Sequence, residues 1–222
     1  MRLPFFHRNP ADLSVLFPDG MDRHSHILWG IDDGAQSPED SQAIINAMRR
    51  IGLRGAWCTP HVMAELPDNT ASNLCKRYNE ALATLDLNGF DLRLAAEYML
   101  DESFLPRLRD NSEKLLTYDG KRLLIEFSRI SLPGNWEEMI FLVQAQGYIP
   151  VLAHPERYGS ILDLEALELL HQNEVEFQIN LSSLIGMRGR HIQKLAQTLR
   201  KKGLCNWIGT DAHRPEHVRS RA

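Results

Sequence analysis

The chain has few cysteines and no pattern that would join them to a metal or to one another. Its 222 residues include only Cys58, Cys75 and Cys205, an odd number without a Cys-X-X-Cys pair. This usage is typical of a reducing compartment and argues against a disulfide framework or a thiolate zinc site, so we expect a cytoplasmic protein. No cysteine is followed six positions later by arginine, because Ala64, Ala81 and Asp211 stand there. The nucleophile of cysteine-dependent phosphatases is therefore excluded.

Long apolar runs and an excess of positive charge are also missing. The net charge is -4 with histidine neutral, which gives no electrostatic reason to expect nucleic-acid binding. No apolar stretch is long enough to span a bilayer, and residues 1–20 lack the apolar core and cleavage site of a signal peptide. We expect residues 1–20 to form an N-terminal arm, and residues 21–222 to form a single domain.

Short apolar runs alternate with helical patterns along this expected domain. Strands are predicted over residues 21–28, 55–59, 92–97, 123–127, 149–153, 177–181 and 207–210. Helices are predicted over residues 37–52, 69–85, 101–109, 136–146, 162–171 and 191–202. Strands that alternate with helices indicate βαβ units and a parallel sheet. Seven such units favour an α/β fold with a closed or nearly closed barrel over an open sheet.

Polar side chains recur where the predicted strands end, which is where α/β barrels carry their catalytic groups. Six of the seven strands end in histidine or carboxylate residues: His24 and His26, His61, Glu97, Glu126, His154, and Asp211 and His213. The sixth strand ends in Asn180, which is polar but a weak metal ligand.

These residue types in this pattern indicate a metal site. His24 and His26 lie two residues apart on a strand, so both imidazoles face the same side and can share a cation. Carboxylates directly after apolar strands are costly to bury unless they are paired or bind a metal. Mixed nitrogen and oxygen ligands favour Zn, Mn or Fe(II). Each residue taken alone has a structural interpretation, such as a histidine whose nitrogens are hydrogen-bonded within the fold or a carboxylate in a salt bridge. The prediction of a metal site therefore depends on the co-occurrence of these residues. His171 and His191 are interpreted as helix-surface residues, and His7 and His217 stay unassigned.

Several segments together resemble a known family. They are HSHILWGIDDGAQSPEDS, CTPH, AAEYML, LLIEFS, VLAHPERY, INLSSLIG and GTDAH, which follow in order between about residues 21 and 213. They resemble the polymerase-and-histidinol-phosphatase (PHP) superfamily, and within it the bacterial capsular-polysaccharide-type protein-tyrosine phosphatases. The resemblance implies a distorted seven-stranded parallel β/α barrel with two or three divalent cations, Mn, Fe or Zn.

The resemblance also implies a role for each candidate residue. One cation would be held by His24, His26, Glu97 and Asp211, a second by Asp33, His61 and His213, and a third by Glu97, Glu126 and His154. Asp32 competes with Asp33 as the ligand, and its alternative role is to cap a loop. Arg157 would contact substrate phosphate, or else form a surface ion pair with Glu156 or a neighbour. Asp211 or His213 would assist protonation of the leaving group.

The activity implied is phosphomonoester hydrolysis by a metal-bound hydroxide, because a cation can lower the pKa of bound water towards about 7. The expected substrate is a phosphotyrosine protein, the tyrosine-rich tail of a bacterial kinase that controls polysaccharide export. The alternatives are another hydrolase on the same scaffold, such as a histidinol-phosphate phosphatase, a phosphodiesterase or an amidohydrolase, and a non-catalytic metal-binding barrel. The chain ends nine residues after His213, so we expect a short or truncated C-terminal helix.

Overall fold

The first βα unit forms as its sequence predicts. In the computed structural model, which describes residues 13–110 and 114–218, β1 (Met21–Ser25) leads through a loop to α2 (Pro38–Arg50). The Ser37 side chain accepts a hydrogen bond from the Asp40 backbone, and the Asp40 carboxylate accepts one from the Ser37 backbone. This reciprocal capping box satisfies two amides that the first turn would otherwise leave unpaired, and Pro38 suits the first helical position.

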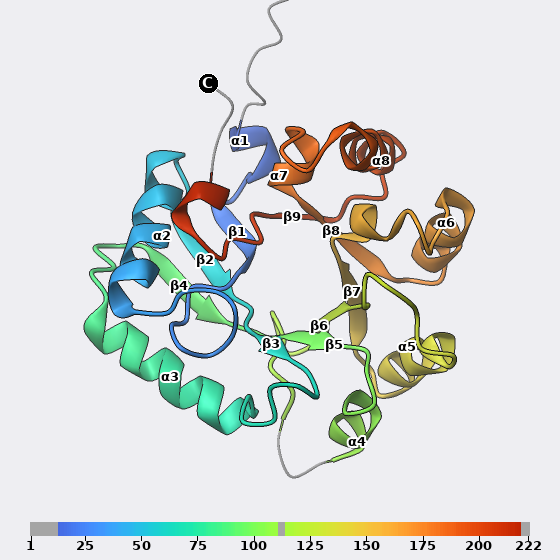
Figure 1. Cartoon of the computed structure of the whole chain (residues 1–222), viewed down its shortest axis with the longest axis horizontal. Coiled ribbons are helices and arrows are strands. Elements are labelled where there is room, and N and C mark those ends of the chain that lie inside the picture. The colour runs from blue at the N-terminus through green and yellow to red at the C-terminus, as the bar shows by residue number, and fades with distance from the viewer. Residues whose placement is uncertain (1–12, 111–113, 219–222) are drawn as a thin grey trace, which may run out of the picture.

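The remaining strands are all parallel to their neighbours. They are β2 (Gly55–Cys58), β3 (His61–Val62), β4 (Asp91–Leu94), β5 (Glu97–Met99), β6 (Arg122–Glu126), β7 (Ile149–Ala153), β8 (Glu176–Asn180) and β9 (Trp207–Gly209). One sheet has the order β1-β2-β4, and the other has the order β3-β5-β6-β7-β8-β9. Figure 1 shows the strands arranged as a ring with the helices around it.

Two of the predicted strands are interrupted, which corrects their boundaries. The strand predicted over residues 92–97 is two strands, β4 and β5, that belong to different sheets. Glu97 therefore begins β5 rather than ending a strand, and His61 begins β3 after a break at Thr59 and Pro60. Proline has no amide hydrogen to donate to the ladder. The Pro60 carbonyl still accepts from the Glu97 amide at 3.0 Å, so the two interrupted paths stay side by side.

The ring closes between the first and last strands. Ser25 and Ala212 form an isolated parallel bridge. The His26 amide donates to the Ala212 carbonyl at 3.0 Å, and the Asp211 amide donates to the His24 carbonyl at 2.8 Å. These bonds join residues almost 190 positions apart and bring both ends of the metal-ligand pattern together. The predicted parallel α/β barrel of seven strand paths, two of them interrupted, is confirmed.

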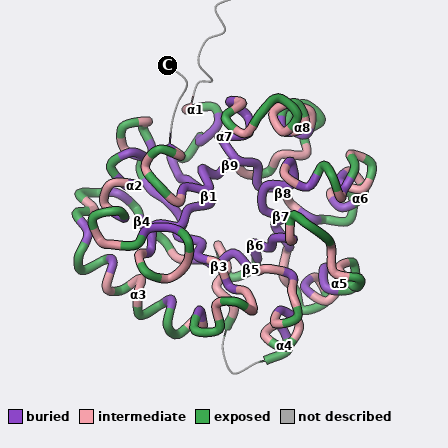
Figure 2. The backbone as a smooth tube through the Cα atoms, viewed as in Figure 1, coloured by how far each residue is buried: buried purple, intermediate pink, exposed green. Residues whose placement is uncertain are grey.

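Helices cover the outside of the ring and bury one face against it. They are α2, already described, and α3 (Ala71–Thr84), α4 (Phe104–Arg109), α5 (Trp136–Ala145), α6 (Leu164–Gln172) and α8 (Arg190–Lys201). Figure 2 shows buried backbone along the strands and exposed backbone on the outer sides of the helices. Short elements that the sequence pattern did not predict are α1 (Leu13–Leu16), α7 (Leu181–Leu184) and the 3-10 turns Pro155–Tyr158 and Pro215–His217.

The residues just before β1 pack on the barrel. Leu16 and Phe17 are buried and join the main hydrophobic core. The remainder of the expected N-terminal arm, residues 1–12, and the expected C-terminal end at residues 219–222 lie outside the described residues. Within residues 13–110 and 114–218, no helix is long and apolar enough to cross a membrane.

Candidate metal centre

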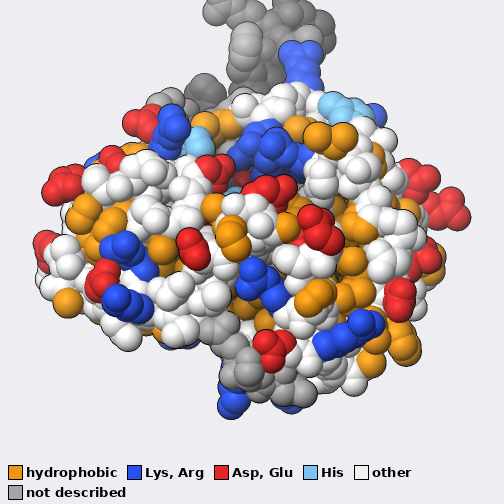
Figure 3. Space-filling model, turned by 60° about the horizontal axis from the view of Figure 1, so that its bottom comes forward, with side chains coloured by type: hydrophobic (Ala, Val, Ile, Leu, Met, Phe, Trp, Pro, Cys, Tyr) orange, Lys and Arg blue, Asp and Glu red, His pale blue; other side chains and the backbone are white. Residues whose placement is uncertain are grey.

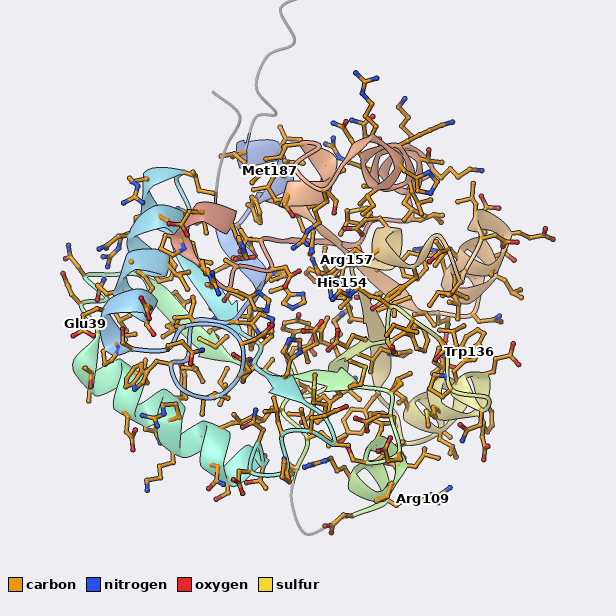
Figure 4. All side chains as sticks on the ribbon, viewed as in Figure 1. Glu39, Arg109, Trp136, His154, Arg157 and Met187 are labelled. Carbon is orange, nitrogen blue, oxygen red and sulfur yellow. The ribbon has the colours of Figure 1, made fainter. Side chains whose placement is uncertain are left out.

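The residues predicted as metal ligands meet at one mouth of the barrel. All nine are connected through side-chain atoms less than 4 Å apart: His24, His26, Asp33, His61, Glu97, Glu126, His154, Asp211 and His213. Figure 4 shows His154 and Arg157 near the middle of the ring, while Glu39, Arg109 and Trp136 lie at its periphery. The fold thus brings together side chains that span most of the chain.

His24 and His26 present their Nε2 atoms to the same point. His24 Nδ1 donates to the Gln178 Oε1 atom at 2.7 Å, and His26 Nδ1 donates to the Asp32 Oδ2 atom at 2.8 Å. With Nδ1 as the donor, the Nε2 atom of each neutral ring carries a lone pair. These two atoms lie 3.2 Å apart, and they lie 3.0 and 3.4 Å from Glu97 Oε2. When both rings are neutral, three electron-pair donors converge on this point, which is the state that metal ligands must adopt.

A second pair of atoms supports the same conclusion. His61 Nδ1 and Glu126 Oε1 are buried and only 2.9 Å apart, yet neither has a hydrogen-bond partner. Glu97 Oε2 lies 3.1 Å from the same His61 atom. Buried polar atoms without partners are rare in folded proteins and need an explanation. A divalent cation between the carboxylates and the imidazole would satisfy all three groups, so the residues present fit a metal.

The two aspartates of the DDG segment have different environments. Asp32 is buried, and its carboxylate accepts from His26 Nδ1, from the His61 amide at 3.0 Å and from the Gly34 amide at 2.9 Å. Asp33 is 73% exposed, and its Oδ1 lies 3.1 Å from His213 Nε2 and 3.4 Å from His61 Nε2. Asp32 is thus committed to orienting its neighbours, while Asp33 keeps oxygens available to a cation.

The Asp211 carboxylate joins the histidines to two arginines. Its Oδ1 lies 3.7 and 3.6 Å from the Nε2 atoms of His24 and His26. Its Oδ2 accepts hydrogen bonds from Arg157 at 2.9 Å, from Asn180 at 2.7 Å and from Arg188 at 3.3 Å. Arg157 therefore pairs with Asp211 inside the site, and no ion pair between Arg157 and Glu156 occurs among the described residues.

Two predicted site residues have an unusual backbone conformation. His154 has φ 37° and Asp211 has φ 53°, which lie in the left-handed backbone region that residues other than glycine seldom adopt. His154 Nε2 lies 3.1 Å from Glu97 Oε1, and its Nδ1 lies 3.2 Å from the Tyr158 hydroxyl. Strained residues of this kind cluster at functional sites, where the surrounding structure holds them in place.

Two glycines allow the backbone to approach the histidines closely. A Cβ atom at Gly34 would lie 2.5 Å from the His26 Cβ atom, and one at Gly209 would lie 2.6 Å from the His24 Cβ atom. The Gly209 position also faces Gln178 Nε2 at 2.7 Å. Any side chain at either position would displace an imidazole or the group that orients it.

Charges inside the cluster act on each other strongly. Burial opposes protonation of His26, but the Asp32 carboxylate outweighs it and raises the pKa of His26 to about 10. His61 is likewise desolvated, yet Glu97 raises its pKa well above the usual value. Burial and the charge of Glu97 together raise the pKa of Glu126. The buried carboxylates are therefore stable only with positive charge close to them. Protonated histidines provide this charge when no cation is bound, and a divalent cation would provide more of it.

The cluster opens into a cavity of about 660 Å³, which we call the metal cleft. Its lining includes Asp33, His61, Glu126, His154, Asp211 and His213, together with four arginines: Arg129, Arg157, Arg188 and Arg214. Figure 3 shows Lys and Arg side chains gathered beside acidic and histidine side chains on one face of the molecule. Bound cations would offset the carboxylates of this lining, and the four arginines would then suit the cleft to an anionic ligand.

Sequence reasoning missed several residues of this site. Gln178 was missed; it lies two residues before Asn180 on β8, and this period-two spacing from a polar strand end was the available signal. His217, left unassigned, lines the metal cleft, and its Nδ1 accepts from the His213 amide at 3.3 Å. Arg188 lies in the segment between α7 and α8, where no periodicity marks it. His171 is partly exposed and His191 is exposed on their helices, as predicted, while His7 lies outside the described residues.

Comparison with known proteins identifies the family. A family model described as "Capsular polysaccharide synthesis, CpsB/CapC" matches residues 20–221. Tyrosine-protein phosphatase YwqE of Bacillus subtilis is 31% identical over 206 residues, covering 87% of this chain and 77% of the relative. Tyrosine-protein phosphatase CpsB of Streptococcus pneumoniae is 24% identical over 201 residues, covering 87% of this chain and 82% of the relative.

Solved structures agree with this result. A crystal structure described as belonging to YwqE from Bacillus subtilis and CpsB from Streptococcus pneumoniae, "unique metal-dependent tyrosine phosphatases", matches with a TM-score of 0.79 and 27% identity, covering 90% of this chain and 82% of that chain. A phosphotriesterase homology protein from Escherichia coli, with a TM-score of 0.51 and 13% identity, shares the fold alone. The chain belongs to the CpsB/CapC family of capsular polysaccharide synthesis.

Proposed function

We propose that this protein is a metal-dependent tyrosine phosphatase that hydrolyses phosphotyrosine monoesters in the metal cleft. The observation that carries the proposal is the convergence of lone pairs from His24, His26 and Glu97 on one buried point, beside a cleft lined by arginines. The B. subtilis and S. pneumoniae relatives bear the name of this activity, and the chain has the same fold.

The cations would be held by three overlapping groups of side chains. The first is His24, His26 and Glu97; the second is His26, Asp33, His61 and His213; the third is His61, Glu97 and Glu126. Asp211 and His154 adjoin these groups through Oδ1 and Nε2, which matches the ligand roles that the family resemblance implies. Bound cations would supply the nucleophile by lowering the pKa of water and would offset the charge of the phosphate.

Arg157 is proposed to bind the phosphate. Its guanidinium is held at the wall of the metal cleft by one hydrogen bond to Asp211 Oδ2, which leaves other N–H groups of the planar fork for phosphate oxygens. Arg188 approaches the same carboxylate oxygen and also donates to the Ser182 hydroxyl at 3.0 Å. Because both guanidiniums are tethered, they can be in position before substrate arrives.

Asp211 and His213 are proposed to manage the proton of the leaving group. His213 Nδ1 lies 3.1 Å from the Asp211 carbonyl oxygen, so this nitrogen carries the proton and Nε2 faces Asp33. Both side chains reach the metal cleft, next to the arginines that would fix the ester. The Asp211 carboxylate accepts three hydrogen bonds and carries no proton in this arrangement, so whichever of the two residues acts would first take up a proton and then pass it to the departing tyrosine oxygen.

We also propose a place for the protein in the cell. The natural substrate would be the phosphorylated tail of a bacterial tyrosine kinase of polysaccharide biosynthesis, acted on by a phosphatase domain of residues 21–222 that follows a short arm. Among the described residues, Cys58, Cys75 and Cys205 form no disulfide bond, which suits the reducing cytoplasm.

Substrate competition tests the proposal. The purified protein, loaded with Mn²⁺, Fe²⁺ or Zn²⁺ in parallel, is offered a phosphotyrosine peptide, histidinol phosphate and a phosphodiester. We expect turnover of the peptide in at least one metal form, with kcat/KM at least tenfold above the other two substrates. Preferential turnover of histidinol phosphate or the diester would assign a different reaction to the scaffold, and inertness in every metal form would favour a binding protein.

A further inference from the structure

A second cavity adjoins the metal cleft on the same side of the barrel. Its volume is about 790 Å³, and we call it the flanking groove. Loops that follow β3, β5 and β6 form it, and these strands carry His61, Glu97 and Glu126. Four residues line both cavities, namely Met63, Glu65, Met99 and Ser128. The flanking groove is therefore continuous with the site where the phosphate would be bound.

The two cavities have opposite chemistry. The metal cleft is lined by four arginines, whereas the described lining of the flanking groove contains no lysine or arginine. Its surface is apolar along Met63, Met99, Leu105, Pro106, Leu132, Pro133 and Met139. Glu65, Asp101 and Glu102 supply negative charge, and none of them forms an ion pair with a described Lys or Arg.

The loop between β6 and α5 runs along the boundary of the two cavities, and its Ser128 lines both of them. Arg129 and Ile130 face the metal cleft, and Ser131, Leu132 and Pro133 line the flanking groove. Ile130 is 88% exposed, which leaves a large apolar side chain in water at the rim of the cleft. Its side chain is therefore placed where it would contact a polypeptide bound in the metal cleft.

We propose that the flanking groove binds the residues next to phosphotyrosine in the substrate, taking up one apolar side chain and disfavouring acidic ones. This inference rests on the proposed phosphatase function. The apolar wall would bury a side chain such as Leu or Met, and the three carboxyl groups would repel an aspartate or glutamate. The arginines of the metal cleft would bind the phosphate group. The flanking groove would bind a neighbouring side chain of the same polypeptide.

Matched phosphopeptides test the groove. A parent peptide with alanine at the three positions on each side of phosphotyrosine is varied one position at a time to Leu, Asp or Lys, and kcat/KM is measured for each. We expect one or two positions at which Leu exceeds Asp by about tenfold or more, the scale of selection by an apolar pocket. Values that stay within twofold at all six positions would overturn the proposal.

Two variants assign the preference to the flanking groove. Glu102→Lys replaces an exposed carboxylate of its lining with an ammonium group, a change of two charge units, and should raise kcat/KM for the Asp peptide about threefold or more. Leu132→Ala should reduce kcat/KM for the Leu peptide by about threefold or more. Neither change should alter turnover of p-nitrophenyl phosphate, which has no flanking residues. Glu39→Lys, on the far edge of the ring, is the matched charge control and should leave every peptide unchanged.

The outcomes separate this inference from the proposed function. If p-nitrophenyl phosphate and all phosphopeptides are inert with every metal, the phosphatase function fails and the groove proposal fails with it. If p-nitrophenyl phosphate and the parent peptide are hydrolysed but the variants change all substrates equally, only the groove proposal is overturned.

Discussion

Asp32 and Asp33 are adjacent in sequence, but replacing each with asparagine should have different consequences. The Asp32 carboxylate accepts three hydrogen bonds, two at Oδ2 from His26 Nδ1 and the His61 amide, and one at Oδ1 from the Gly34 amide. Asparagine has one acceptor oxygen and one donor nitrogen. The side-chain amide of Asp32→Asn can lie in two orientations. In one its NH2 group faces the Gly34 amide, and in the other it faces the His61 amide and His26 Nδ1, so a donor meets a donor in both. Each orientation loses at least one bond to a charged acceptor.

The size of the effect follows from those bonds. Losing one hydrogen bond to a charged group costs about 1.5–3 kcal/mol, which corresponds to a fall in Tm of roughly 3–12 °C for a chain of this size. His26 also loses the carboxylate that orients its Nε2 atom, and such losses typically weaken metal binding by about 10–100-fold. Asp33 makes no comparable backbone contact and is 73% exposed, so Asp33→Asn should lower metal affinity with a change in Tm of no more than about 2–4 °C.

Thermal unfolding in chelator and metal affinity by competition with a chromophoric chelator measure the two effects separately. The expected pattern is loss of both stability and affinity in Asp32→Asn, and loss of affinity alone in Asp33→Asn. An Asp32→Asn protein with wild-type Tm and wild-type metal affinity would refute the assignment of Asp32 to orienting His26. The reverse pattern in the two variants would exchange their roles.

Three further predictions concern pH, packing and the arginines. The pKa of His26 is raised to about 10 from the ordinary 6.5, so its protonation stabilises the folded metal-free protein. This contribution is complete below about pH 6.5 and is lost as the pH rises towards 10. Denaturant unfolding in chelator should therefore show a free energy of unfolding that declines from pH 6 to pH 8 to pH 10. Gly209→Ala should destabilise the protein by about 1–3 kcal/mol, because the new Cβ atom would overlap His24. Gly134→Ala is the control, because a Cβ atom there would have open space. Equal urea midpoints for the two variants would contradict this prediction. Arg157→Ala should lower kcat by about 100-fold with unchanged metal content. Arg188→Ala should lower kcat less, because the hydrogen bond from Arg188 to Asp211 is longer. Metal loss in either variant would indicate that the arginine has a structural role instead.

Much of the architecture could be predicted from local patterns. The Ser37 cap, the proline that follows it and Gly52 located α2, and apolar runs located β6, β7 and β8 to within one residue. The interruption between β4 and β5 could not be predicted, because the segment from Leu92 to Glu97 contains no glycine or proline that would mark a break. The break lies beside Pro60 of the neighbouring path, whose carbonyl accepts from the Glu97 amide, and such pairing between distant segments is a tertiary property.

The candidate site was predicted where residue type alone carries the signal. Histidines and carboxylates at strand ends were identified because parallel strands bring their ends to one edge. The roles of Asp32 and Gln178 depend on which ring nitrogen each one contacts, and sequence spacing does not contain that information. Arg188 reaches Asp211 from a loop, so only the folded chain reveals the contact.

The central claim is that the clustered histidines and carboxylates bind the cations on which phosphotyrosine hydrolysis depends. The most direct test measures bound metal per chain and phosphotyrosine hydrolysis in the same samples during chelation and metal re-addition, for wild type and for His24→Ala and Glu97→Ala. We predict that wild-type activity falls and returns in proportion to bound metal, and that both variants lose metal and nearly all activity. Wild-type activity that survives complete removal of metal would contradict the account.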